Sequence, residues 1–227
     1  MSSGPLGLLQ NGWEGLVAFL LFAGAIVVAI ALHEYAHALA ADLQGDRLPR
    51  AMGRLTLNPV RHLDPLGTVL IFIAGFGWGK PVEFRLSALS SKRFGAAIVA
   101  LAGPSMNVAL GLLGAIGLRL TNPGLLSILG GRGDVFDLST PSFVDMFLAT
   151  FMTVNVILAV FNLIPVPPLD GSRLLTIFLP PDKQGIVFFL DRYGFLILLA
   201  VVFLGPRTLF TPLIDGVLSL VAGLTGL

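Results

Sequence analysis

The chain has 227 residues, of which 55% are hydrophobic and only 12% are charged, and its net charge is +1. This balance excludes an ordinary soluble domain and is typical of a protein that crosses the membrane several times. The near-zero net charge gives no overall positive field that would attract nucleic acid. The chain has no cysteine. Disulfides, thiol catalysis and cysteine zinc sites are therefore excluded, and histidines and carboxylates remain as the candidate metal ligands.

The first apolar segment, about 13–40, ends in an HExxH motif. Its uncharged stretch 16–32 is followed at once by His33, Glu34 and His37. Residues four apart share one face of a helix, so the two imidazoles can bind one metal ion, and Glu34 can serve as the general base for a water held there. The residues before this segment lack the basic region of a signal peptide, so we expect a retained transmembrane helix.

Further apolar segments follow in chain order, at about 66–79, 94–118, 143–166, 186–204 and, more weakly, 208–226. The second segment has only about 14 residues, which is too few to span a bilayer, and we predict a re-entrant element near 66–85. The expected fold is an all-α polytopic membrane protein with five to six hydrophobic segments. We expect one membrane-embedded domain over 1–227, with its core at about 13–175 and accessory C-terminal helices at 186–226.

The positions of lysine and arginine predict the orientation in the membrane. If the first segment ends inside the cell, eleven of the 14 basic residues lie on the cytoplasmic side and three lie outside. This distribution follows the positive-inside rule and places the HExxH end of the helix near the cytoplasmic face.

A catalytic zinc ion needs a third protein ligand, and the sequence leaves two candidates. One is His62, in the Asn-Pro-rich stretch 58–65, and the other is Asp170, which follows the apolar segment 143–166 and precedes Gly171. A carboxylate that directly follows a helix broken by prolines can turn back toward the membrane boundary. An aspartate before a glycine is also common in turns and helix caps, so the residues alone do not choose between the candidates.

Several motifs together resemble the site-2 protease family of intramembrane zinc metalloproteases, in its compact form without appended PDZ or CBS domains. They are HExxH at 33–37, Gly-Pro-Ser-Met-Asn at 103–107, the Asn162…Pro165…Pro167…Leu169-Asp170-Gly171 run, and Gly-Trp-Gly-Lys-Pro-Val at 77–82. The motifs occur in the family's order over roughly two-thirds of the chain. The resemblance implies that Asp170 is the third ligand, with His33 and His37, of one zinc ion per chain.

Two asparagines lie within or at the edge of apolar segments, where a buried amide needs a hydrogen-bonding partner. Asn107 and Asn162 can each hold helices together, or each can donate a hydrogen bond to the substrate carbonyl oxygen. The resemblance favours the catalytic role for Asn162 and, more weakly, for Asn107. Asn155 matches no motif and is expected to serve packing.

The predicted function is hydrolysis of peptide bonds within or near transmembrane helices of membrane-protein substrates. The expected partners are a transmembrane or membrane-anchored protein and the lipid bilayer, with no nucleic acid, and the resemblance implies a multi-pass protein of a prokaryotic cell membrane. The alternative is a membrane transporter or metal-handling protein that uses intramembrane His, Glu and Asp, although the sequence has no internal repeat of the kind that transporters often show.

Overall fold

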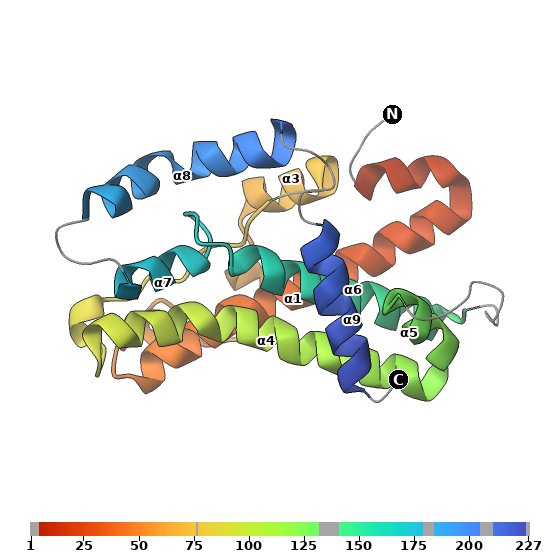
Figure 1. Ribbon diagram of the computed structural model, residues 1–227, viewed down its shortest axis with the longest axis horizontal. Coiled ribbons are helices and arrows are strands. Elements are labelled where there is room, and N and C mark those ends of the chain that lie inside the picture. Colours follow the sequence, from red (N-terminus) through yellow and green to blue (C-terminus); the bar gives the residue numbers. More distant parts are fainter. Residues whose placement is uncertain (1–4, 76, 132–140, 179–183, 205–210, 226–227) are drawn as a thin grey trace.

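The computed structural model describes residues 5–75, 77–131, 141–178, 184–204 and 211–225, which form helices joined by loops (Figure 1). Within these ranges the backbone makes no strand, only one isolated antiparallel bridge between Leu63 and Gly79. The predicted all-α fold is confirmed.

Three helices in the described ranges are long and apolar enough to cross a membrane. They are α1 (Gly12–Leu43), α4 (Lys92–Thr121) and α6 (Phe143–Asn162). The short 3-10 helix Pro5–Asn11 precedes α1. The three long helices pack against one another and correspond to the first, third and fourth apolar segments of the sequence, as expected for an integral membrane protein.

The short second apolar segment forms α3 (Pro65–Ala74) followed by an extended return. Asp64 caps the start of α3 by accepting a hydrogen bond from Gly67 N at 2.8 Å, and Gly75, with φ of 75°, ends the helix in the left-handed conformation that favours glycine. The chain then turns back so that Lys80 N donates to His62 O at 2.7 Å. This helix and its return are the element predicted near 66–85, and they bring Gly79 against α1.

The remaining helices are shorter or peripheral: α2 (Leu48–Ala51), α5 (Pro123–Leu129), α7 (Gly171–Phe178), α8 (Gln184–Leu204) and α9 (Thr211–Leu224). In Figure 1, α8 runs along the edge of the molecule opposite α4. The ring of Phe195 on α8 lies 5.4 Å from the ring of Trp78, centroid to centroid, in an edge-to-face contact. Helix α8 therefore covers part of the return segment that follows α3.

An ion pair between a buried aspartate and an exposed arginine fixes the polar loop between α1 and α4. Asp46 is fully buried and accepts hydrogen bonds from the backbone N and the guanidinium of Arg85, the latter at 2.8 and 3.1 Å. Burial alone would raise the pKa of Asp46, but the hydrogen bonds from Arg85 hold it below its usual value. The carboxylate is therefore charged and anchors the two ends of the loop to each other.

Glycines on α4 allow α6 to approach closely. Gly111, Gly114 and Gly117 all face α6, and a Cβ atom on Gly114 would lie 3.1 Å from the Cβ of Met152. Small residues at such a crossing let helix backbones pack by van der Waals contact, which is the main attraction available between helices in lipid. Met152 is fully buried in this contact and belongs to a core that also includes residues of α5 and α9.

We expect Gly114→Val to destabilise the protein by about 1–3 kcal/mol, because the added methyl groups overpack the α4–α6 contact. The matched control is Gly24→Val on α1, where an added Cβ meets no atom within 4 Å. Thermal unfolding in detergent, followed by circular dichroism, should give a lower midpoint for the Gly114 variant only. Equal midpoints for the two variants would contradict this account of the crossing.

Candidate metal centre

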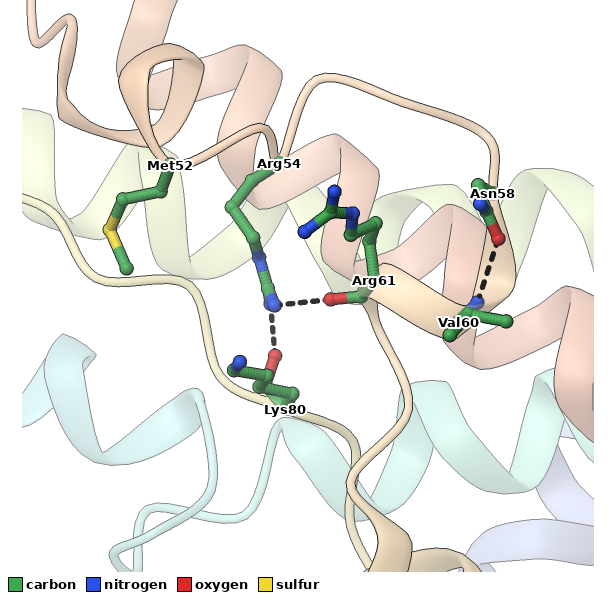
Figure 2. Close-up of a pocket in the computed structure, with 6 residues that line it drawn as sticks. All are labelled: Met52, Arg54, Asn58, Val60, Arg61 and Lys80. Atoms are coloured by element: carbon green, nitrogen blue, oxygen red, sulfur yellow. Dashed lines mark hydrogen bonds between the residues drawn. The ribbon is translucent and has the colours of Figure 1, made fainter.

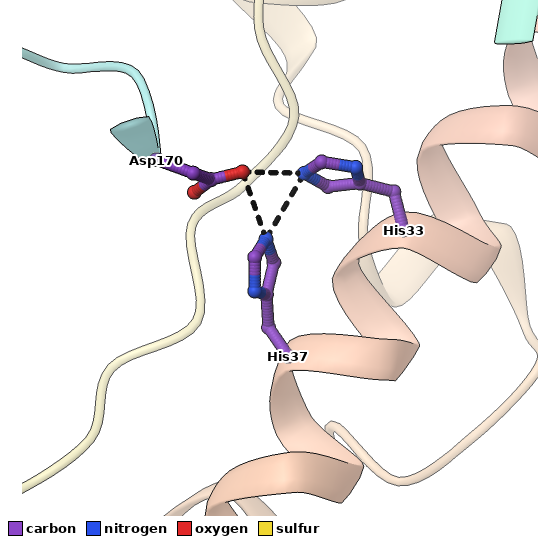
Figure 3. A group of neighbouring side chains, drawn as sticks. All are labelled: His33, His37 and Asp170. Atoms are coloured by element: carbon purple, nitrogen blue, oxygen red, sulfur yellow. Dashed lines mark hydrogen bonds and ion pairs between the residues drawn. The ribbon is translucent and has the colours of Figure 1, made fainter. Parts of the chain in front are cut away.

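Three potential ligand atoms converge between α1 and the start of α7 (Figure 3). The Nε2 atoms of His33 and His37 lie 3.0 Å apart, and Asp170 Oδ2 lies 3.1 Å from the first and 3.2 Å from the second. Both histidines are buried, while the Asp170 side chain keeps 23% of its surface exposed. The structure thus brings together all three residues that the sequence analysis proposed as ligands.

These separations fit a metal ion. Two ligand atoms that each bind zinc at about 2.0–2.1 Å with a tetrahedral angle are about 3.3 Å apart. The observed distances of 3.0–3.2 Å are close to that value for all three pairs. Two histidines, one carboxylate and a fourth position open for water make the usual ligand set of a catalytic zinc site.

The chain around Asp170 is shaped to return the carboxylate to α1. Helix α6 ends at Asn162, and the proline-containing segment 163–170 leads to Gly171, the first residue of α7. A Cβ atom on Gly171 would lie 2.3 Å from the carbonyl oxygen of Leu163, so only glycine permits this close turn. Burial alone would raise the pKa of Asp170, but its hydrogen bonds with the two histidines lower it below its usual value.

The other ring nitrogen of each histidine is held by the protein. His37 Nδ1 donates to the carbonyl oxygen of Val99 at 2.7 Å, and His33 Nδ1 lies 2.5 Å from Asn107 Oδ1. A proton on Nδ1 leaves the Nε2 lone pair free for a metal, and such second contacts orient metal-binding imidazoles in general. Both partners lie on α4, so this helix supports the back of the site.

Helix α4 approaches the two imidazoles most closely at Gly103. A Cβ atom there would lie 2.3 Å from His37 Nε2 and 2.6 Å from His33 Cε1. Pro104 follows within the continuous helix α4 and is itself fully buried. Gly103 therefore permits the close approach of α4 to the two imidazoles.

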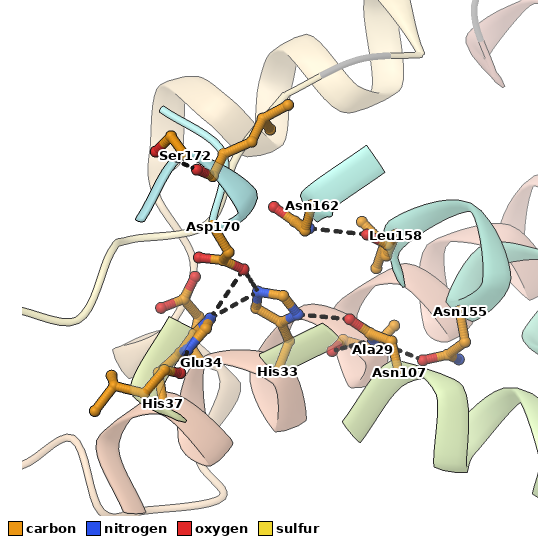
Figure 4. A network of polar contacts seen from close by, with 12 residues as sticks. Ala29, His33, Glu34, His37, Asn107, Asn155, Leu158, Asn162, Asp170 and Ser172 are labelled. Atoms are coloured by element: carbon orange, nitrogen blue, oxygen red, sulfur yellow. Dashed lines mark hydrogen bonds and ion pairs between the residues drawn. The ribbon is translucent and has the colours of Figure 1, made fainter. Parts of the chain in front are cut away.

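Glu34 is buried beside the two histidines and beneath the return segment after α3 (Figure 4). A Cβ atom on Gly79 would lie 3.1 Å from Glu34 Oε1, so the extended chain passes directly across this carboxylate. Arg54 Nη2 lies 3.6 Å from Glu34 Oε2. The carboxylate thus has a buried cation on one side and a backbone segment on the other.

Arg54 also ties two loops together at a basic pocket (Figure 2). Its guanidinium donates to the carbonyl oxygens of Arg61, at 2.5 Å, and Lys80. The pocket has a volume of about 420 Å³ and is lined by these three residues together with Met52, Asn58 and Val60. In the sequence Arg54 is a lone arginine in a polar loop, which carries no spacing signal.

His62, the other candidate for the third ligand, does not join the cluster. It is fully buried, and its Nε2 lies 2.7 Å from the carbonyl oxygen of Thr56. Burial lowers the pKa of His62. The neutral ring therefore steadies the loop whose Arg61 carbonyl binds Arg54, and the structure leaves Asp170 as the third residue beside the histidines.

The structure separates the two asparagines that the sequence analysis proposed for the substrate carbonyl. Asn162 lies at the end of α6 facing Asp170, and it donates one hydrogen bond to Leu158 O at 3.0 Å (Figure 4). Asn107 lies behind His33 and is fully buried; its Nδ2 donates to Asn155 Oδ1 at 2.8 Å and to Ala29 O at 3.4 Å. Both N–H groups of Asn107 thus face acceptors within the protein, and its expected contact with the substrate carbonyl stays a prediction.

Comparison with known proteins identifies the class. The model of peptidase family M50 matches residues 21–201. The "Putative zinc metalloprotease YwhC" of Bacillus subtilis (strain 168) is 35% identical over 181 residues, which is 80% of this chain and 78% of that protein. The "Putative zinc metalloprotease Rip2" of Mycobacterium tuberculosis (strain H37Rv) is 31% identical over 194 residues, covering 83% of this chain and 68% of that protein. No solved structure gives a significant match.

The helical membrane fold, the convergence of His33, His37 and Asp170, and relatives of these names define an intramembrane zinc metalloprotease. The chain belongs to peptidase family M50, the site-2 protease family.

We expect Gly103→Ala to lower zinc affinity at least about tenfold, because the methyl group would occupy space held by the two imidazole rings. The control is Gly111→Ala on the same helix, where the nearest atom to an added Cβ is Val156 Cγ2 at 3.3 Å. Chelator competition in detergent measures both affinities. An unchanged zinc affinity in Gly103→Ala would mean that the rings can move without loss of binding.

Proposed function

We propose that His33, His37 and Asp170 bind one zinc ion per chain and that Glu34 is the general base of peptide-bond hydrolysis. The proposed substrate is a transmembrane or membrane-anchored protein, cut within or near a membrane-spanning helix. The observation that carries this proposal is the convergence of three ligand atoms within 3.2 Å of one another, although Asp170 lies more than 130 positions from the two histidines in the chain.

The residues would divide the reaction between them. His33, His37 and Asp170 would hold the zinc ion, which would supply Lewis-acid activation of the scissile carbonyl and of the attacking water. Glu34 accepts the proton of the attacking water and delivers it to the leaving amine. Asn162 uses one N–H on Leu158 O, and the second N–H of the same amide donates to the substrate carbonyl oxygen as that oxygen gains charge.

The return segment after α3 is the proposed binding edge for the substrate. Its extended backbone passes over Glu34 at Gly79, next to the catalytic groups. A peptide bond inside a helix is protected by its own hydrogen bonds, so the substrate must unwind before water can attack. An extended protein segment can hold an unwound peptide in place by main-chain hydrogen bonds.

The proposed location is a prokaryotic cell membrane with the site toward the cytoplasm. The excess of basic residues in the loop between α1 and α4 supports this orientation by the positive-inside rule. The bacterial sources of the relatives support the prokaryotic assignment. We place the metalloprotease core at about 13–175, with α8 and α9 as accessory helices.

A transporter or metal-handling role is the less favoured alternative. The histidines, Glu34 and Asp170 serve proteolysis as a set, whereas a metal carrier has no use for a base beside its ligands. Membership of a peptidase family also favours the protease.

We expect Glu34→Gln to lower the rate of cleavage of a membrane-protein substrate at least about 10²-fold, while the zinc content stays at the wild-type level. Asp170→Ala should lose both activity and zinc, because it removes a ligand. Metal analysis of the purified variants and a cleavage assay in detergent or liposomes measure the two effects. Cleavage by Glu34→Gln would exclude the proposed base, and full zinc content in Asp170→Ala would exclude Asp170 as a ligand.

Replacing residues 78–81 as a block should lower the rate of cleavage and leave zinc content unchanged, because the segment would bind substrate and does not contribute a ligand. Cleavage of a model single-span substrate, compared with zinc content of the same samples, checks this. An undiminished rate would remove the binding edge from the mechanism.

A further inference from the structure

We infer that Asn155 is a positioning residue that acts through Asn107 to hold His33 in its metal-binding tautomer. This inference rests on the proposed function, and it concerns two asparagines that form what we call the amide relay: Asn155 on α6 and Asn107 on α4. Figure 4 shows the relay leading from α6 to His33 on α1.

The first hydrogen bond of the relay joins Asn155 to a backbone carbonyl. Asn155 Nδ2 donates to the carbonyl oxygen of Phe151 at 2.9 Å. A backbone carbonyl can only accept, so the NH2 end of the Asn155 amide must face Phe151 and its Oδ1 must point the other way. That oxygen lies 2.8 Å from Asn107 Nδ2.

The hydrogen-bond partners of the Asn107 amide fix its orientation in the same way. Asn107 Nδ2 also lies 3.4 Å from the carbonyl oxygen of Ala29, a second group that can only accept. With its NH2 end committed to two oxygens, Asn107 must present Oδ1 to His33, and Oδ1 lies 2.5 Å from His33 Nδ1. An oxygen there accepts, so Nδ1 carries the hydrogen and Nε2 keeps its lone pair.

The orientation of the Asn107 amide decides whether His33 can bind a metal through Nε2. If the Asn107 amide turned over, its NH2 group would face His33 Nδ1, which would then have to accept. The hydrogen would sit on Nε2, the atom that points at His37 and Asp170, and the ring could not bind a metal through it. Asn155 opposes this turn, because its oxygen would then face the oxygen of Asn107.

Burial makes the relay effective. Asn155 and Asn107 are both fully buried and His33 is nearly so, which leaves no water to replace a missing partner. His37 has no equivalent relay, because its Nδ1 binds the backbone carbonyl of Val99 directly. The protein thus orients one ligand by backbone and the other by two side chains.

The test measures zinc affinity by chelator competition, with an apo thermal midpoint for each variant. Asn155→Val should bind zinc 10–100-fold more weakly, as is usual when a partner of a metal-binding histidine is lost. Asn155→Thr, whose side chain has the shape of valine, should lose less than Asn155→Val, because its hydroxyl can donate to Phe151 O and still accept. The packing control is Met152→Ala on the same face of α6, which should lower the thermal midpoint and leave zinc affinity within about twofold.

A double-mutant cycle separates a relay from two independent effects. In an Asn107→Leu background, Asn155→Val should cause no further loss of zinc affinity, because the intermediate group is already absent. Should Asn155→Val fail to fold, Asn155→Thr replaces it in the cycle, with a smaller loss in the wild-type background and none in Asn107→Leu.

Three results would overturn the inference: zinc affinity of Asn155→Val equal to wild type, equal losses in Asn155→Val and Met152→Ala, or the same loss in both backgrounds of the cycle. Each of them leaves the proposed function intact if wild type binds zinc. Failure of the wild-type protein to bind zinc would instead overturn the proposed function itself.

Discussion

The close approach of α4 to α1 at Gly103 is the constraint on which the rest of the site depends. The backbone of α4 lies against the edges of both imidazoles, at a distance that a single methyl group would close. This contact fixes which way the rings can turn, and it brings Val99 and Asn107 within reach of their Nδ1 atoms. Three ligand atoms can then gather where α1 alone would supply only two.

Hydrogen bonding in a medium without water explains the arrangement of the other polar groups. A buried polar atom in lipid or in a protein core costs free energy unless it is paired. The Nη atoms of Arg54 pair with two backbone carbonyls and the Glu34 carboxylate, and Asp46 pairs with Arg85. These hydrogen bonds and ion pairs also hold the polar loops against the catalytic end of α1. The contacts that stabilise the loops therefore also assemble the site.

The sequence predicts the parts of the site that depend on local geometry. The i, i+4 spacing of His33 and His37 is a property of any helix, and the apolar segments that became α1, α4 and α6 follow from hydrophobicity and length. Asp170 needed more than spacing, because its return to α1 depends on the turn at Gly171 and on α6 packing against α1 and α4. Family resemblance supplied that information, and residue patterns alone could not.

Asn107 and Asn155 show what sequence reasoning does not supply. The direction in which an amide points depends on its neighbours in space, so nothing in the sequence assigned Asn107 to the back of His33 and not to a substrate. Asn155 was expected to serve packing, although it stands seven residues before Asn162. That interval is two helical turns and puts both residues on one face of α6, which is the signal that could have found it.

The same interval limits how α6 can vary. Membrane helices whose length does not match the bilayer adjust by tilting, by kinking or by deforming the bilayer around them. Between Asn155 and the segment that carries Asp170, one inserted residue would rotate everything beyond it by about 100°. The number of residues in this half of α6 is therefore fixed by the positions that Asn155 and Asp170 must take at the site. Any change of helix length to suit the bilayer thickness has to occur in the other half of α6, toward Phe143.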